Sequence, residues 1–573
     1  MTQPKPRDVQ TASIGADTTV LRSRTWDRLK FEVEYSLQRG TTANSFLIQA
    51  EKTAVFDPPG ESFTEIYLRE LQQCIDLQQL DYAILGHVNP NRVITLKALL
   101  ELAPQVTFVC SKSGAVALRT AFPKRELKVL VARGEETLDL GKGHQLGFIP
   151  IPTPRWPDGL CTYDPETGIL FTDKLFGTHV CSEQVFDDGW KLLDEDRRHY
   201  YDCLHAAQSR QVSTALDKIT QLSVKLYAPG HGPVVRYSKS RLTHDYQQWS
   251  QQQQNRDMTV ALIYASAYGN TATLAQAIAK GITKASVGVE LINCEFTAAA
   301  EIQAAVEKSD GFIIGSPTLG GHMPTQVQTA LGIVLSTAAK SKLAGVFGSY
   351  GWSGEAVDEI ESKLKDAGYC FGFDTIRVKF KPTDATLQQC KEAGTDLAQA
   401  LKKAKKIRTP RQPISDSQID RTEQAVGRIV GSLCVVAARR KEVESAMLAS
   451  WVSQASFNPP GLTVAVARDR AIEPLMHTGD RFVLNILQEG MNLRRHFLKP
   501  FAPGEDRFAG LPTQAAENGC PILSEALAYL ECTVANRIEC GDHWLVYAVV
   551  GNGKVLQPGG MTAVYRRKSG SQY

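Results

Sequence analysis

A chain of 573 residues is too long for one hydrophobic core, so several domains are expected. The net charge of +3 is spread along the chain and gives no indication of nucleic acid or an anionic membrane as a partner. The 12 cysteines are scattered without a C-x-x-C pair, which argues for reduced thiols and against zinc ribbons and cysteine-ligated iron–sulfur clusters. No apolar run reaches the roughly 18 residues of a membrane helix, and no apolar signal segment is visible, so we expect a cytoplasmic protein.

Two polar stretches divide the chain. Residues 246–257 form a glutamine-rich connector, and residues 402–418 are first basic and then rich in proline and serine, as interdomain linkers often are. The expected organisation is an N-terminal extension, three modules, and a linker before the last module. The extension covers residues 1–30, the three modules cover residues 31–250, 258–405 and 420–570, and the linker covers residues 406–419.

The first module contains the stretch LGHVNPNRV, from Leu85 to Val93. It resembles the first metal-binding loop of the β-lactamase-type metallohydrolase fold, which predicts an αββα sandwich for this module. Most of the metal ligands of that loop are absent here, and an arginine stands at one of their positions.

The middle module alternates buried apolar strands with helical patterns. The runs TVALIY, DGFIIG and LAGVFG are each followed by a loop with hydroxyl side chains, and helices follow. This alternation predicts a doubly wound parallel sheet, in which ligands bind at the carboxyl ends of the strands.

The three loops of the middle module have the composition of a nucleotide site. SAYGNT leads into a helix N-terminus, which suits a phosphate dianion, and the absence of a following Walker lysine argues against a nucleoside triphosphate. Tyr350 and Trp352 are suited to covering a flat ring. The module resembles flavodoxin, which implies FMN as its ligand. The implied FMN-binding residues are Ser266, Ala267, Tyr268, Gly269, Asn270, Thr271, Ser316, Pro317, Thr318, Leu319, Gly320, Ser349, Tyr350, Gly351 and Trp352.

The C-terminal module consists of β-branched runs separated by turn residues, which predicts a β-barrel or sandwich. Residues 450–460, SWVSQASFNPP, resemble the flavin-binding signature of the NAD(P)H:flavin reductase family, a split β-barrel. This resemblance implies a second flavin, FMN or FAD, with NAD(P)H bound against it. The residues it implicates are Ser450, Ser453, Ser456, Asn458 and His543.

The order of the three modules resembles the flavodiiron proteins with a fused flavin reductase, found in oxygenic phototrophs. That family reduces O₂ to water at a diiron centre and receives electrons from NAD(P)H or another donor through its flavins. The family is usually oligomeric, with the FMN of one subunit beside the metal site of another.

The iron ligands implied by this resemblance are largely missing. The family pattern is H-x-E-x-D-H, a histidine before W-P-D, an aspartate shortly before F-G, and a late histidine; only two of these residues match. The corresponding positions here are His87, Asn89, Asn91, Arg92, Arg155, Lys174 and His231. The remaining nearby candidates for metal ligands are Asp173, His144 and His179.

Charge is the reason to expect no metal in this pocket. Arginine stays protonated and has no lone pair to donate, and two cations 4 Å apart repel by about 4 kcal/mol at an effective dielectric near 20. We therefore expect a cavity without acids that holds no diiron centre and binds an anion near Arg92, Arg155 and Lys174.

The favoured hypothesis is a flavin-bearing electron-transfer protein that serves O₂ reduction as a homo-oligomer or together with a metal-competent paralogous subunit. Two alternatives stay open: an NAD(P)H:O₂ oxidoreductase with its own diiron centre, and a non-catalytic regulatory subunit whose pocket binds an anion.

Overall fold

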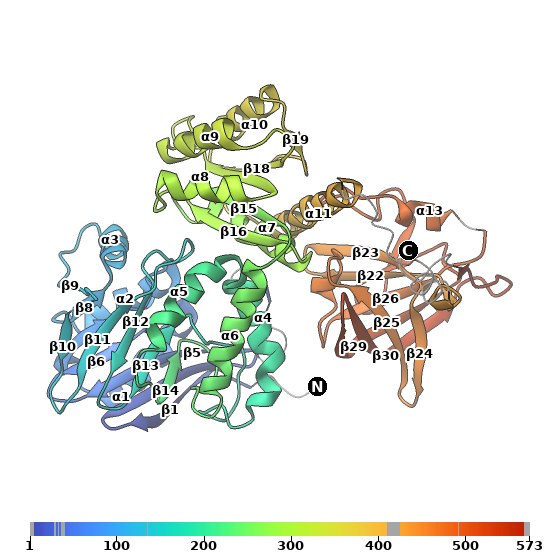
Figure 1. The fold of residues 1–573 in the computed structure, drawn as a ribbon. Helices are drawn as coiled ribbons and strands as arrows, with labels where there is room; N and C mark the ends of the chain where they lie inside the picture. The colour runs from blue at the N-terminus through green and yellow to red at the C-terminus, as the bar shows by residue number, and fades with distance from the viewer. Residues whose placement is uncertain are drawn as a thin grey trace. The chain divides into compact units, whose positions relative to one another are not determined.

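The computed structural model describes residues 5–27, 30–31, 34–35, 40–134, 136–408, 425–490 and 492–566. The chain divides into two compact units, Met1–Asp257 with Gly288–Ala298 and Met258–Val287 with Ala299–Tyr573 (Figure 1). Most of the linker expected over 406–419 lies outside the described residues. Within the described ranges, no helix has the length and apolar character needed to cross a membrane.

The first unit contains two stacked β-sheets. The order of the first sheet is β1-β2-β5-β6-β7-β8-β9, antiparallel up to β6 and parallel beyond it. The order of the second is β10-β11-β12-β13-β14. The first sheet comprises β1 (Asp8–Gly15), β2 (Thr18–Thr25), β5 (Thr41–Gln49), β6 (Thr53–Phe56), β7 (Leu80–Ile84), β8 (Thr107–Cys110) and β9 (Val129–Val131). The second comprises β10 (Thr137–Asp139), β11 (Gln145–Pro150), β12 (Leu160–Asp164), β13 (Ile169–Asp173) and β14 (Leu226–Pro229).

The sequence of β5 shows why the sheets form layers. Successive side chains of a strand point to opposite faces, and Phe46 and Ile48 pack between the two sheets whereas Leu47 packs under the helices. The layers are therefore helix, sheet, sheet and helix, which confirms the predicted αββα sandwich. Strands β1 and β2 belong to the first sheet, so part of the stretch expected as an N-terminal extension is built into the fold.

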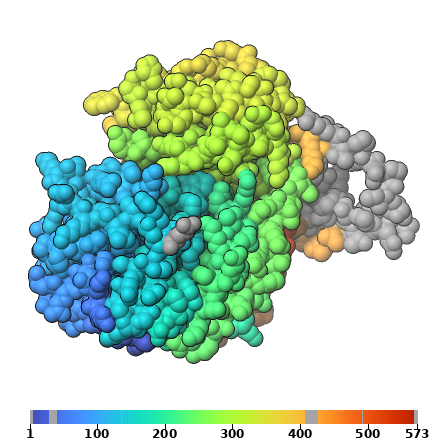
Figure 2. Space-filling model, turned by 60° about the vertical axis from the view of Figure 1, so that its left-hand side comes forward, coloured from blue at the N-terminus to red at the C-terminus, as the bar shows by residue number. Residues whose placement is uncertain are grey.

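Helices cover both outer faces of the sandwich. Figure 2 shows one closely packed face of this unit in blue to green. The helices are α1 (Thr64–Cys74), α2 (Pro90–Leu102) and α3 (Lys112–Ala121) on the first sheet, and α4 (Asp194–Leu204), α5 (Ser209–Ile219) and α6 (Lys239–Gln254) on the second. The short strands β3 (Lys30–Phe31) and β4 (Glu34–Tyr35) pair with each other.

The flavodoxin-like part has a parallel sheet in the order β16-β15-β17-β18-β19, with β20 also paired to β18. Because β15, β17 and β18 are neighbours, the loops that follow them meet at one edge of the sheet. The strands are β15 (Thr259–Tyr264), β16 (Gly288–Asn293), β17 (Gly311–Pro317), β18 (Leu343–Tyr350), β19 (Cys370–Phe371) and β20 (Ile376–Lys379). The helices are α7 (Asn270–Lys284), α8 (Ala299–Lys308), α9 (Thr325–Thr337), α10 (Glu355–Asp366) and α11 (Asp384–Arg408). The predicted doubly wound sheet is confirmed.

The reductase-like part is an antiparallel split barrel in the order β23-β22-β26-β29-β30-β25-β24. Its long strands are β22 (Cys434–Arg440), β23 (Val443–Ala449), β24 (Val452–Phe457), β25 (Pro460–Ala467), β26 (Arg481–Ile486), β29 (Ala528–Cys540) and β30 (His543–Val555). Its short elements are β21 (Gly431–Ser432), β27 (Thr513–Ala515), β28 (Pro521–Leu523), β31 (Val564–Tyr565) and α13 (Leu493–Leu498). One face of the sheet carries an apolar cluster that includes Val436, Val464 and Val546.

Two glycines allow α7 and α11 to pack backbone against backbone. A Cβ on Gly281 would lie 2.0 Å from the carbonyl oxygen of Lys391, and a Cβ on Gly394 would lie 2.1 Å from that of Ile278. Glycine in the interior of a helix is usually unfavourable. Here it is required, because the close crossing leaves no room for the methyl group of alanine.

We expect Gly394→Ala to destabilise the flavodoxin-like part by about 1–3 kcal/mol through overpacking, although glycine to alanine in a helix ordinarily stabilises by about 1 kcal/mol. Gly332 in α9 is the matched control, because a Cβ there meets no atom within 4 Å. Urea unfolding of the three proteins measures the difference. An equal stabilisation by Gly394→Ala and Gly332→Ala would contradict the close crossing.

Candidate functional site

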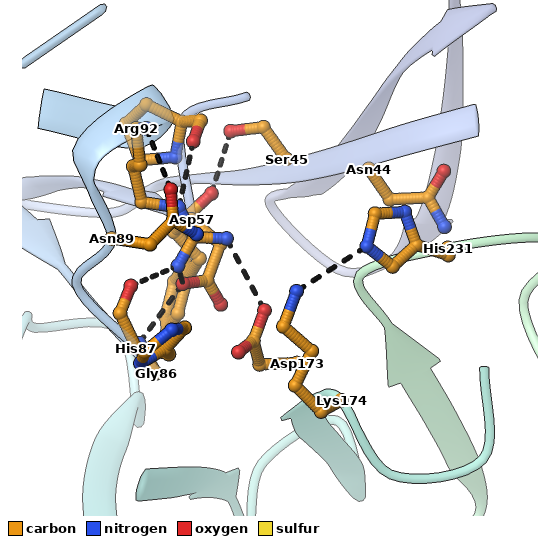
Figure 3. Close-up of polar contacts among 12 residues, drawn as sticks. Asn44, Ser45, Asp57, Gly86, His87, Asn89, Arg92, Asp173, Lys174 and His231 are labelled. Atoms are coloured by element: carbon orange, nitrogen blue, oxygen red, sulfur yellow. Dashed lines mark hydrogen bonds and ion pairs between the residues drawn. The ribbon is translucent and has the colours of Figure 1, made fainter. Parts of the chain in front are cut away.

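The first candidate site lies where strands of both sheets of the first unit end. Asp57 follows β6, His87 lies in the loop after β7, Asp173 ends β13, and His231 follows β14. Figure 3 shows Asp57 and Asp173 gathered around the guanidinium of Arg92. The pocket therefore collects side chains from segments that are far apart in the sequence.

The guanidinium of Arg92 is the central group of this pocket. It is buried, with Nη1 2.8 Å from Asp57 Oδ1 and Nη2 3.2 Å from Asp173 Oδ1. Nε donates to the carbonyl of Pro58 at 3.0 Å, and Nη1 also donates to the carbonyl of His87. Burial alone would lower the pKa of Arg92, but the two carboxylates raise it, so the side chain stays charged.

Helix α2 delivers Arg92 to this place. The side chain of Asn89 accepts a hydrogen bond from the Arg92 amide at 2.9 Å and caps the helix, and Pro90 fits the first turn because it has no amide to satisfy. Asn91, the next position of the loop pattern, is exposed. Asn89 therefore caps α2, and Asn91 lies exposed in its first turn.

The ammonium of Lys174 faces a histidine. His231 Nδ1 donates to the carbonyl of Thr42 at 2.7 Å, which leaves its Nε2 as the acceptor 3.4 Å from Lys174 Nζ. Burial, and then the charge of Lys174, lower the pKa of His231 to about 3. His205 donates from Nε2 to the carbonyl of Lys174 at 3.1 Å, and its pKa is lowered to about 3, chiefly by burial. Both imidazoles are neutral at physiological pH.

Arg155 is the third cation predicted for this pocket. Its Nη1 donates to the carbonyl of Cys203 at 3.2 Å, and its guanidinium lies 4.9 Å from the ring centroid of Trp156. After burial, the charges of Arg155 and Lys174 both contribute to the lowered pKa of His205. Arg155 and Lys174 thus share His205 as a neighbour, whereas Arg92 and Lys174 share Asp173.

The expectation of a pocket without acids is wrong. Asp57 and Asp173 pair with Arg92, and Asp158 binds His87 Nδ1 at 2.7 Å and the amide of Val88 at 2.8 Å. Burial raises the pKa of Asp57, whereas Lys174 and Arg92 outweigh burial and lower the pKa of Asp173.

The missed acids follow recognisable sequence signals. Asp57 comes directly after the buried strand TAVF, where ligands are expected, and Asp158 belongs to the W-P-D motif itself. Asp173 was identified as a neighbour of Lys174 and as a candidate metal ligand, but not as a partner of Arg92.

The residues present do not fit a diiron centre. Of the family ligand positions, only His87 and His231 match, and two histidines are too few ligands for two iron ions. Across the described parts of the chain, no group of three or more His, Cys, Asp or Glu side chains could hold a metal ion. Asp173 holds Arg92.

The two histidines considered as substitute ligands have other partners. His144 Nδ1 lies 2.9 Å from Asp164, and His179 Nδ1 lies 2.5 Å from the hydroxyl of Thr41.

The second candidate site is the loop edge of the flavodoxin-like sheet. Gly269 has φ +81° and caps α7, and a Cβ there would meet no atom, so its backbone is open to a ligand. The hydroxyls of Thr271 and Ser349 share a hydrogen bond of 2.8 Å, and Ser266 Oγ accepts from the amide of Ala272 at 3.1 Å. The structure thus joins the first and third predicted loops at the N-terminus of α7, where a phosphate fits.

The aromatic residues of these loops are almost fully exposed. Trp352 is 93% and Tyr268 is 86% exposed, which is unusual for such large side chains and suits residues that cover a flat ring. In the middle loop, the Thr318 amide donates to the carbonyl of Ser349 at 2.9 Å. Ser316 is buried and donates to the carbonyl of Pro317, so its hydroxyl is engaged within the loop.

The remaining predicted residues lie on or beside the same three loops: Ala267, Leu319, Gly320 and Gly351 are in the loops, Asn270 begins α7, and Tyr350 ends β18. The residues present fit FMN.

The third candidate site is the flavin reductase motif. Ser450 is buried beside the end of β23, whereas Ser453 is exposed on the β24–β25 hairpin. Ser456 Oγ donates to the carbonyl of Pro459, and Asn458 precedes that proline. His543 is buried, at 4.9 Å between ring centroids from Trp451 and with Nδ1 2.7 Å from Asp542. Ser450 and the hairpin residues thus differ in burial.

Family models match each part of the chain. They are the ODP family beta lactamase over residues 41–232, flavodoxin over 262–394, and the flavin reductase like domain over 426–571. Diflavin flavoprotein A 6 of Nostoc sp. is 68% identical over the full length of both chains. Diflavin flavoprotein A 1 of Synechocystis sp. is 45% identical and covers 99% of this chain and 98% of its own. The chain belongs to the diflavin flavoproteins of the flavodiiron family.

A solved structure of a relative supports this assignment. The metal-soaked Flv1 flavodiiron core from Synechocystis sp. superposes with a TM-score of 0.68 at 62% identity and covers 70% of this chain and all of its own. The chain is accordingly a flavoprotein of an oxidoreductase family and has a fused flavin reductase domain, as the resemblance predicted.

Removing Arg92 should leave two buried carboxylates without a counter-charge. We expect Arg92→Ala to destabilise the first unit by about 3–5 kcal/mol, the usual consequence of breaking a buried ion pair. Arg125→Ala, which breaks an exposed pair with Glu101, should cost less than about 1 kcal/mol. Urea unfolding measures both. Adding Asp57→Asn to Arg92→Ala should recover stability, and no recovery would argue against the charge explanation.

The buried neutral histidines should make stability depend on pH. The folded pKa values of His205 and His231 lie below the unfolded value of about 6.5, so unfolding takes up protons below that pH. Stability is therefore lost as the pH falls from about 6.5 toward 3, by about 1.4 kcal/mol per pH unit for each histidine. His205→Gln should reduce this slope when urea unfolding is compared at pH 7, 6 and 5. A slope equal to that of the wild type would contradict it.

Proposed function

We propose that this chain carries electrons from NAD(P)H through its flavin modules for the reduction of O₂ to water, and that a metal-competent paralogous subunit performs the oxygen chemistry. The observation that supports this division is the guanidinium of Arg92, held between Asp57 and Asp173 where the family places metal ligands. The two flavin modules keep the features that their ligands need, whereas the metal pocket does not.

Electrostatics explain why iron does not compete with Arg92. A metal ion bound to Asp57 and Asp173 would have to displace the guanidinium, which cannot lose its proton and would become a second buried cation beside the metal. Lys174, on the other side of Asp173, adds to this repulsion.

The flavodoxin-like module would hold FMN through its own backbone and hydroxyl groups. The amides at the start of α7, with Gly269 open to the ligand, would bind the phosphate, and Trp352 and Tyr268 would flank the ring. FMN supplies one-electron chemistry when bound, and these residues bind it, orient it and limit its exposure to water.

The reductase-like module would supply the entry of electrons. NAD(P)H gives up two electrons as a hydride, so two NAD(P)H and two protons are consumed for each O₂ that becomes two waters. Ser450 and the neighbouring hairpin would position the flavin that accepts this hydride, as the reductase resemblance implies.

A second proposal is a regulatory anion site. Lys174 and the histidines 87 and 205 line a small cavity of about 20 Å³, enough for a water molecule or a small ion. Because Arg92 is already paired with two carboxylates, such an anion would depend mainly on Lys174. This proposal predicts that chloride stabilises the first unit and that Lys174→Gln abolishes the effect.

The test of the main proposal is a metal and flavin count on the protein as purified, followed by O₂ consumption with NADH or NADPH. We expect iron near zero, one flavin in each flavin module, and O₂ reduction to water only after addition of a metal-competent diflavin flavoprotein. Thr271→Val should lose the FMN of the flavodoxin-like module, because its hydroxyl bonds to Ser349, and should keep the reductase flavin.

The same measurements can overturn the proposal. Stoichiometric iron and production of water by this chain alone would show that it has its own diiron centre. Two bound flavins without NAD(P)H oxidation would favour a regulatory subunit.

A further inference from the structure

A cavity in the second unit has a volume of about 610 Å³, within the range of small-molecule sites. The flavodoxin-like helices α7 and α11 form one wall, and the reductase-like strand β23, the loop after β25 and the segment around α13 form the others. It is separate from the FMN loops, which lie at the other end of α7.

Specific contacts join the two walls. Gln399 Nε2 donates to Asp469 Oδ2 at 2.7 Å, and Gln388 Nε2 donates to the carbonyl of Ala471 at 2.9 Å. Lys284, the last residue of α7, forms an ion pair with Glu473. Glutamine side chains of α11 and the end of α7 are thus matched to one loop of the reductase-like part.

The lining of the cavity includes seven lysine and arginine side chains and three carboxylates. Four of the seven cations form ion pairs with carboxylates: Lys284, Arg468, Lys499 and Arg507. The others are Lys391 and Lys403 from α11 and Arg470 from the reductase-like part. Phosphate groups are well matched to lysine and arginine donors placed together in this way.

The same cavity also has an aromatic and apolar wall. Phe497, Phe501, Tyr565 and Leu448 line it. Together with the cations, this wall suits a ligand that has a flat ring system at one end and a phosphate at the other.

The flavin reductase motif reaches this cavity through one residue. Ser450 lines it, next to the end of β23, whereas the hairpin residues Ser453 and Ser456 do not. The position of Ser450 connects a sequence signature for flavin binding with a cationic wall that is built partly by another module.

We propose that this cavity is the nucleotide site of the reductase-like part, and that Lys391 and Lys403 of the flavodoxin-like helix α11 bind the phosphate of the flavin or nicotinamide nucleotide. This proposal rests on the proposed function, since the ligand is one of its electron carriers. Helix α7 then connects the two flavin modules: the FMN phosphate loop is at its N-terminus and the second cavity is at its C-terminus, about 21 Å away for 15 residues.

The test uses the full-length chain with the double variant Lys391→Ala/Lys403→Ala. The matched control is Lys402→Ala/Lys405→Ala, because these lysines lie on the same helix but do not line the cavity. FMN, FAD, NADH and NADPH are titrated separately into flavin-depleted protein, so the arms show which nucleotide depends on α11. We expect a loss of at least tenfold in affinity for one of them in the double variant, greater at low salt, and wild-type affinity in the control.

Two further measurements distinguish a variant that loses a contact with the nucleotide from a variant that no longer folds. Arg470→Ala, on the reductase side of the cavity, should weaken the same nucleotide, and binding of FMN to the flavodoxin-like module should be unchanged in every variant. If the wild type binds two flavins and oxidises NAD(P)H but the double variant matches it, the location is wrong and the proposed function stands. If the wild type binds one flavin and oxidises no NAD(P)H, both proposals fail.

Discussion

The ion pairs from Arg92 to Asp57 and Asp173 determine how the first unit can be used. Asp57 follows a strand of the first sheet and Asp173 ends a strand of the second, so the guanidinium connects the two layers of the sandwich at their loop edge. A buried carboxylate needs a counter-charge, and here a covalently attached cation provides it. The pocket can therefore be compact and neutral without a metal ion.

The loops of the flavodoxin-like part differ from the pocket around Arg92 in how their polar groups are used. The loops that follow β15, β17 and β18 keep an open glycine, joined hydroxyls and exposed aromatic side chains, all of which suit a ligand that enters from solvent. The first pocket has the opposite character, because its polar groups are buried and bonded to one another. Sites that are satisfied internally favour rigidity, whereas sites with open donors favour binding.

The parallel sheet could be predicted from the sequence because its signals are local: apolar strands, helix spacing and loops at strand ends each occupy a short segment. The αββα layers of the first unit were predicted from the resemblance of one loop to a known fold. It also identified Arg92 and Lys174 as pocket residues from their motif positions, and both lie close to Asp173 in the structure. It did not predict that Arg92 is neutralised, since its partner Asp57 is 35 residues away and only the fold brings the two together. Charge counted along one motif was therefore a poor guide to charge in the folded pocket.

The cationic cavity of the second unit follows the same logic on a larger scale. Lys391 and Lys403 lie in a helix whose sequence pattern indicates only a flavodoxin-like outer helix, and Ser450 lies in a signature that indicates only a reductase. The close crossing at Gly281 and Gly394 brings α11 against α7, and Lys391 and Lys403 of α11 line the cavity. In both units, the function of a charged side chain depends on which distant segment the fold places beside it.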